Sequence, residues 1–275
     1  MTTSNLDQMT GRFFADLAKR QKSLDSLLCV GLDPDLSRLP VRYRSAADPI
    51  LSFCKDVVDA THDLVGCFKP QFAHFAAANA LPALSEIVAY CHEKNVPVIL
   101  DAKRGDVGST SSFYAREAFD VYGADAVTVN PYLGGDSLAP FLERSDKGVI
   151  LLCRTSNPGG ADLQNLKLSS GLEVYEQVAK MAVEQWNSNK NVGLVVGATR
   201  PDELKRVRAI VGEMTLLLPG IGAQGGDVAA SLAAGAGGGL IVSSSRAVLY
   251  PKGGEMAGVR AEAEKTRLSL NEHRL

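Results

Sequence analysis

Eight short apolar segments recur along this chain of 275 residues, and longer amphipathic stretches separate them. The segments are rich in residues that favour strands, and the stretches between them have helical periodicity. The predicted strands are residues 27–32, 65–68, 96–100, 126–129, 149–153, 192–196, 215–218 and 239–242. Strands that alternate with helices form a parallel sheet, and eight such units predict an α/β fold, the (β/α)8 (TIM) barrel. An open, doubly wound sheet is the competing architecture, but the count of eight favours closure.

The stretches between the strands organise the rest of the chain. The predicted helices cover residues 48–64, 73–94, 111–122, 172–188, 201–212 and 228–234. An extra helix at 5–22 is expected to cover the bottom of the barrel. No Pro/Ser-rich linker is present, so we expect a single domain over 1–275, with 1–24 as an N-terminal helical extension and 251–275 as a C-terminal helix.

Composition and charge argue against several classes of function. The formal net charge is -2, so no bulk charge favours nucleic acid or an anionic membrane. The N-terminus lacks the basic start and apolar core of a signal peptide, and no apolar run reaches the ~20 residues of a membrane span. The five cysteines form no C-x-x-C pair and lie mostly in apolar segments, as expected of reduced, buried thiols. We therefore expect a cytoplasmic protein that binds neither nucleic acid nor membranes.

The third predicted strand ends in a cluster of charge, within the sequence VILDAKRGD. Side chains alternate between the two faces of a strand, so Asp101 and Lys103 project to the same side, and Asp106 follows on the loop. A surface salt bridge would explain an isolated acid and base at a strand end. That explanation is weaker here, because polar residues also follow most of the other strands.

These polar residues stand at the predicted carboxyl ends of the strands. They are Asp33, Lys69, Asp101, Lys103, Asn130, Thr155, Ser156, Gln224 and Arg246. In a barrel, the carboxyl ends of all strands meet at one rim, where active sites lie. Residues that are far apart in the chain are therefore expected to converge on one pocket.

A glycine-rich segment, PGIGAQGGD, follows the seventh strand and leads into a helix. Glycines let backbone N–H groups approach an anion there, and Gln224 and Arg246 lie on the same two loops, where phosphate sites recur in this fold. The segment also matches the dinucleotide pattern G-x-G-x-x-G, but no acidic residue stands where a ribose contact would be needed. A bare glycine turn remains the structural alternative.

Together these motifs resemble the orotidine 5'-phosphate decarboxylase family, and most closely its longer bacterial branch. The resemblance covers nearly the whole chain. It rests on GLD at 31–33, FKP at 68–70, DAKRGDVG at 101–108, PGIGAQG at 219–225 and SR at 245–246. The D-x-K-x-x-D element alone is shared with sugar-phosphate barrels, whereas its combination with Lys69 and the glycine–glutamine loop is highly specific.

The resemblance implies conversion of orotidine 5'-monophosphate to uridine 5'-monophosphate and carbon dioxide, the last step of de novo pyrimidine synthesis, with neither metal nor organic cofactor. It implies that Lys103 stabilises the carbanion at pyrimidine C6 and then donates the proton. Asp101 takes the place of a carboxylate near the substrate's own. Lys69 and Asp106 hold Lys103 charged and oriented, and Asp33 matches a ribose contact.

The resemblance also implies a homodimer with shared active sites. The loop after the third strand crosses into the neighbouring subunit, so Asp106 and Thr110 serve the partner's site. Ser156 matches the family's pyrimidine-binding serine, although Thr155 takes this role if the register slips by one residue.

Two other functions remain open from the residues. Metal-dependent relatives that act on sugar phosphates would share Asp101, Lys103 and Asp106, but they usually place an acidic residue where Lys69 stands. The second is a barrel that only binds nucleotide phosphate as a regulator. Such a binder has no reason to hold four charged residues together.

Overall fold

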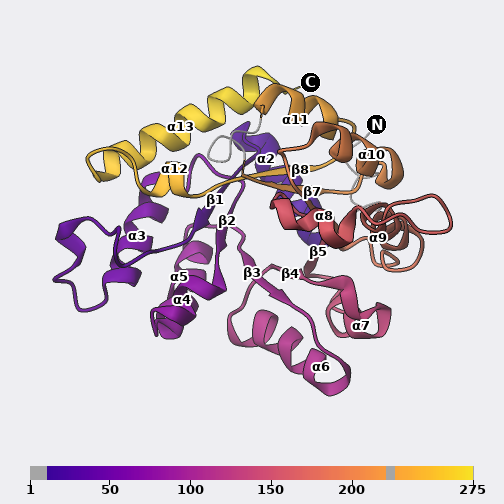
Figure 1. Cartoon of the computed structure of the whole chain (residues 1–275). Coiled ribbons are helices and arrows are strands. Elements are labelled where there is room, and N and C mark those ends of the chain that lie inside the picture. The colour runs from indigo at the N-terminus through magenta and orange to yellow at the C-terminus, as the bar shows by residue number, and fades with distance from the viewer. Residues whose placement is uncertain (1–10, 221–226, 275) are drawn as a thin grey trace.

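The structure, a computed structural model, describes residues 11–220 and 227–274. Eight parallel strands form one sheet in the order β2-β1-β8-β7-β6-β5-β4-β3 (Figure 1). They are β1 (Leu28–Leu32), β2 (Cys67–Pro70), β3 (Ile99–Arg104), β4 (Ala126–Val129), β5 (Gly148–Arg154), β6 (Val192–Val196), β7 (Leu216–Pro219) and β8 (Leu240–Ser244). Two isolated bridges, Phe68 to Val98 and Gln71 to Asp101, join β2 to β3. The expected (β/α)8 barrel is confirmed.

Helices surround the strands on the outside of the barrel (Figure 1). The longer ones are α3 (Pro49–Thr61), α5 (Leu81–Glu93), α6 (Gly108–Arg116), α7 (Gly135–Leu142), α9 (Val174–Glu184), α10 (Pro201–Val211), α11 (Val228–Gly235) and α13 (Met256–Glu272). The helix expected at 73–94 is divided into α4 (Phe72–Ala77) and α5. The division has a local cause, because Asn79 adopts a left-handed φ of 52° and a proline stands in the first turn of α5.

Four strands, β2, β3, β7 and β8, begin and end later than expected, and the displacement is largest for β2 and β3. β2 and β3 both begin and end later than the apolar runs, since polar residues at their carboxyl ends still pair with neighbouring strands. Lys69, Asp101 and Lys103 therefore lie within strands rather than after them. The displacement brings these charged residues inside the barrel mouth.

The bottom of the barrel is closed by α2 (Arg12–Leu24), which confirms the expected N-terminal helix from Arg12 onward. Phe13, Phe14 and Leu17 of α2 pack on a ring of buried residues from the strands. The ring consists of Cys29, Cys67, Ile99, Ala126, Ile150, Val195, Leu217 and Ile241. All five cysteines are free and buried, as expected.

A second layer lies above this apolar ring. Strand side chains share a face every two residues, so the residue two positions after each ring member also faces the barrel interior. These residues are Gly31, Lys69, Asp101, Thr128, Leu152, Gly197, Pro219 and Ser243. Four of the eight, Lys69, Asp101, Thr128 and Ser243, are polar, so polar groups enter the barrel interior at this layer. Within the described ranges, no helix is long and apolar enough to cross a membrane.

Candidate active site

A cavity of about 240 Å³ opens at the carboxyl ends of the strands. Its walls come from β1, β2, β3, β7 and β8 and the residues that follow them. Four of the expected site residues, Asp33, Lys69, Asp101 and Arg246, line it. The barrel thus brings together residues that are more than two hundred positions apart in the chain.

Asp101 lines this cavity and is the centre of a charged array with Lys69, which also lines it, and Lys103, which does not. Its Oδ2 atom accepts a hydrogen bond from Lys69 Nζ at 2.7 Å, and its Oδ1 atom accepts one from Lys103 Nζ at 2.6 Å. Lys69 and Asp101 are each 6% exposed, whereas the side chain of Lys103 is 46% exposed. A buried carboxylate therefore holds one buried ammonium and one that reaches the open side of the site.

Neighbouring charges shift the pKa values of Asp101 and Lys69. Burial alone raises the pKa of Asp101, but the charges of Lys69 and Lys103 outweigh it and hold that pKa well below its ordinary value. Burial alone lowers the pKa of Lys69, but the carboxylates of Asp101 and Asp33 hold that pKa above its ordinary value. Asp101 and Lys69 are therefore both charged at neutral pH.

The backbone of β3 is irregular where Lys103 stands. Leu100 pairs with Val127 and Arg104 pairs with Val129, so the register advances by four residues in β3 but by only two in β4. This is a β-bulge, a device that re-aims side chains next to active sites. Lys103 has a φ of 48°, in the left-handed region.

Thr128, which was not predicted from the sequence, forms hydrogen bonds with both Asp101 and Lys103. Thr128 Oγ1 donates to Asp101 Oδ1 at 2.9 Å and accepts from the backbone N–H of Lys103 at 3.0 Å. Thr128 lies two residues after Ala126, which faces the barrel interior. The strand period would have found it, whereas a search for charged residues did not.

Asp33 is held in place by the end of β8. Its Oδ2 atom accepts a hydrogen bond from Ser245 Oγ at 2.5 Å, while its buried Oδ1 atom has no hydrogen-bond partner among the residues described. Gly31 permits this approach, because a Cβ there would lie 2.8 Å from the Cβ of Ser245. One oxygen of a carboxylate that lines the cavity thus has no partner among the described residues.

The expected phosphate site is described in part. Arg246 is the exposed first residue of α12 (Arg246–Leu249), and Pro219 and Gly220, at the end of the neighbouring strand β7, also line the cavity. Gly220 has a φ of 85°, which a residue with a Cβ rarely adopts. Gln224 lies outside the described residues.

Asp106 and Thr110 do not line the cavity of their own chain. The carboxylate of Asp106 accepts a hydrogen bond from the N–H of Val107 at 2.8 Å, and within the described ranges it makes no ion pair. Thr110 is exposed on α6. Neither residue contacts Lys103 within one chain.

Ser156 also lies outside the cavity lining, although its position is well fixed. A Cβ at Gly197 would lie 2.9 Å from Ser156 Cα, so the end of β6 packs closely on this residue. The neighbouring Thr155 hydroxyl is bonded to Asn157 and Gln164. The Ser156 hydroxyl has no such bond among the described residues, which favours Ser156 over Thr155 as a ligand contact.

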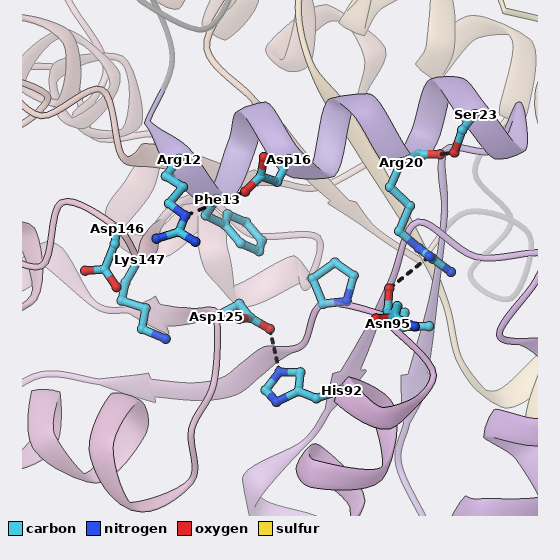
Figure 2. Close-up of a pocket in the computed structure, with 12 residues that line it drawn as sticks. Arg12, Phe13, Asp16, Arg20, Ser23, His92, Asn95, Asp125, Asp146 and Lys147 are labelled. Carbon is cyan, nitrogen blue, oxygen red and sulfur yellow. Dashed lines mark hydrogen bonds and ion pairs between the residues drawn. The ribbon is translucent and has the colours of Figure 1, made fainter.

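A larger cavity of about 520 Å³ lies at the opposite end of the barrel, beneath α2 (Figure 2). Arg20 donates there to the carbonyls of His62, Val65 and Asn95, and His92 contacts Asp125 at 2.8 Å. These polar groups attach α2 and the start of β3 to the barrel. They are far from the charged array at the other rim, and we assign this cavity no part in the chemistry.

The closed barrel and the buried charged array at its carboxyl rim define an enzyme of the (β/α)8 class. The profile of the Orotidine 5'-phosphate decarboxylase / HUMPS family matches residues 26–257. The chain belongs to this family and is a decarboxylase.

Relatives of known name agree with this assignment. An orotidine 5'-phosphate decarboxylase of Azoarcus sp. (strain BH72) is 55% identical over 269 residues, which are 95% of this chain and 99% of the relative. A solved structure of Leishmania donovani OMP decarboxylase is 40% identical with a TM-score of 0.83, covering 96% of this chain and 98% of that chain. A Leishmania donovani UMP synthase is 42% identical with a TM-score of 0.85, covering 96% of this chain and 57% of that chain.

Proposed function

We propose that the protein decarboxylates orotidine 5'-monophosphate to uridine 5'-monophosphate without a metal ion, as the last step of de novo pyrimidine synthesis. The observation that carries the proposal is the Lys69–Asp101–Lys103 array, with contacts of 2.7 and 2.6 Å at the carboxyl rim. A pair of fixed ammonium groups around one carboxylate suits a reaction in which negative charge develops on carbon.

The proposed reaction breaks the bond between C6 of the pyrimidine and its carboxylate. Carbon dioxide leaves, the electron pair stays on C6 in the plane of the ring, and the ring π-system does not delocalise it directly. The Lys103 ammonium stabilises this pair as it forms and then donates a proton to C6, which leaves a neutral amine that regains its proton from solvent. The exposure of Lys103 supports this role, because its side chain is the most exposed of the three in the array.

Asp101 is assigned the place beside the substrate carboxylate. Its lowered pKa keeps it ionised, so repulsion between the two carboxylates is relieved when carbon dioxide leaves. Lys69 keeps Asp101 charged and fixed through the buried 2.7 Å contact. The two lysines thus have different tasks, although both contact the same carboxylate.

The remaining contacts are assigned by position around the cavity. Asp33 binds a ribose hydroxyl through its unpaired Oδ1 atom, and Arg246 binds the phosphate together with Gln224. Ser156 binds the pyrimidine, since its hydroxyl is not used by the protein.

We also propose a homodimer with shared sites, in which Asp106 and Thr110 complete the partner's cavity. Asp106 has no cationic partner within its own described chain. The surface around these residues supports a contact between copies, because large apolar side chains are exposed at the start of α6, within α6 and in the segment after β4. They are Val107, Phe113, Tyr132 and Leu133.

A metal-dependent reaction on a sugar phosphate is the alternative within the same family. Lys69 argues against it, because its ammonium, 2.7 Å from Asp101, already occupies a place where a cation would bind that carboxylate. Loss of the ultraviolet absorbance of orotidine 5'-monophosphate, followed with the purified protein, separates the two. We expect the same rate with and without EDTA. No absorbance change, or a rate that EDTA abolishes and magnesium restores, contradicts the proposal.

A further inference from the structure

We propose that Thr128 is a positioning residue that aligns the Lys103 ammonium for catalysis, an inference that rests on the decarboxylation proposed above. Thr128 is 1% exposed and does not line the cavity, so it acts through its neighbours rather than on the substrate. Its hydroxyl is the group that connects the Asp101 carboxylate to the Lys103 backbone.

The direction of both hydrogen bonds is fixed by chemistry. A backbone N–H only donates, so Thr128 Oγ1 must be the acceptor from Lys103. An ionised carboxylate only accepts, so the single hydroxyl proton of Thr128 goes to Asp101 Oδ1. The hydroxyl therefore has one proton arrangement, and it holds the carboxylate and the backbone in one geometry.

The β-bulge explains why this bond is needed. Two extra residues in β3 take the N–H of Lys103 out of the regular ladder with β4, and the side chain of Thr128 supplies the acceptor. The ladder resumes one residue later, where Asn130 donates its N–H to the carbonyl of Arg104 at 2.7 Å. Thr128 and Asn130 therefore hold the bulge from both sides of Lys103.

The bulge in turn sets the direction of the Lys103 side chain. A left-handed φ of 48° is unfavourable for a residue with a Cβ and persists only where the surroundings hold it. The side chain is half-exposed, so packing restrains its tail little. Its ammonium is placed by two restraints, the contact with Asp101 and the backbone that Thr128 holds.

Thr128→Val removes the hydroxyl while keeping the size and branching of the side chain. We expect kcat to fall between about tenfold and 100-fold through misplacement of the ammonium, with KM changed little. Thr128→Ser keeps the hydroxyl and should restore most of kcat. Thr61→Val is the matched control, because Thr61 is also fully buried and its hydroxyl bonds only to the Val57 carbonyl within α3.

One further measurement and one replacement variant keep the test decisive. Amide hydrogen exchange at Lys103, followed by mass spectrometry, should accelerate in T128V and not in T61V, whatever the turnover. If T128V does not accumulate as folded protein, T128C replaces it with the same expectations, since a thiol is a weaker hydrogen-bonding group.

The outcomes separate this inference from the proposed function. A wild-type protein that does not consume orotidine 5'-monophosphate overturns the function, and the exchange measurement still tests the bond. An active wild type with a T128V variant of unchanged kcat overturns the positioning role alone. Unchanged exchange at Lys103, or a change confined to KM, overturns it as well.

Discussion

Mixing two inactive variants should restore activity if the active sites are shared between subunits. Lys103 contacts Asp101 of its own chain, whereas Asp106 contacts only its own neighbour Val107 among the residues described. In the proposed dimer, each site takes Lys103 from one subunit and Asp106 from the other. Asp106→Asn and Lys103→Ala subunits, each inactive alone, should therefore complement each other.

The size of the recovery follows from counting sites. A heterodimer has one site with both defects and one site with neither. Random exchange of equal amounts makes half of the dimers heterodimers, so about a quarter of all sites are intact, and activity should approach about a quarter of wild type. Activity should vary with mixing ratio as the product of the two subunit fractions, with its maximum at equal amounts.

The assay is decarboxylation after subunit exchange, with exchange verified by native mass spectrometry of differently tagged subunits. Lys69→Ala mixed with Lys103→Ala is the control, because both residues contact Asp101 of the same chain and every site keeps one defect. No recovery with verified exchange, or equal recovery in the control pair, refutes the shared site.

Four further outcomes follow from the same geometry. Lys103→Ala should remove ~3–4 kcal/mol or more of transition-state stabilisation. Measured kcat should fall accordingly, with less effect on substrate binding, and more than about a tenth of wild-type activity contradicts the assignment. Arg246→Ala should weaken binding of uridine 5'-monophosphate strongly and of uridine little in calorimetry, and an equal loss for both would indicate a structural role. The lowered pKa of Asp101 stabilises the fold above about pH 4, and this contribution is lost as pH falls through the folded-state value. Asp101→Asn should therefore lower the free energy of unfolding in urea at pH 7. The difference in this free energy between the variant and the wild type should become smaller by pH 3. A difference that does not change with pH argues against the pairing of Asp101 with the two lysines. Phe14→Ala should lower the free energy of unfolding by ~3–5 kcal/mol, because this side chain fills the barrel bottom, and a loss below about 1 kcal/mol would show that α2 is dispensable there.

The barrel was predictable because its apolar segments are separated by clear helical stretches. The strand at Ala126–Val129 and the strand at Val192–Val196 have the expected bounds, since apolar residues occupy their whole length. β2 and β3 were placed too early, because their carboxyl ends carry polar side chains that an apolar run does not include. Hydrophobic residues indicate the buried part of a strand, whereas the backbone hydrogen bonds between strands extend to the polar residues at the carboxyl ends.

The array of Lys69, Asp101 and Lys103 was also predictable, because each is a charged residue at a strand end. Thr128 was not identified, since an uncharged residue inside a strand gives no signal until its face is known. The bulge at Lys103 was not predictable either, because no glycine or proline stands between Leu100 and Arg104. The bulge depends on the pairing of β3 with β4, which a single sequence does not contain.

The junction of β2 with β3 has a consequence for how the enzyme loses activity. Every other pair of neighbouring strands shares a ladder of at least two paired residues, whereas in the described chain β2 and β3 are joined by isolated bridges and by the ion pair between Lys69 and Asp101. We expect the barrel to open first at this junction, which would separate the two charges before the helices unfold. Inactivation in denaturant should therefore precede the loss of helical signal. A substrate analogue that binds to both β2 and β3 should delay this inactivation. The charged pair proposed to act in the reaction therefore also helps to close the barrel.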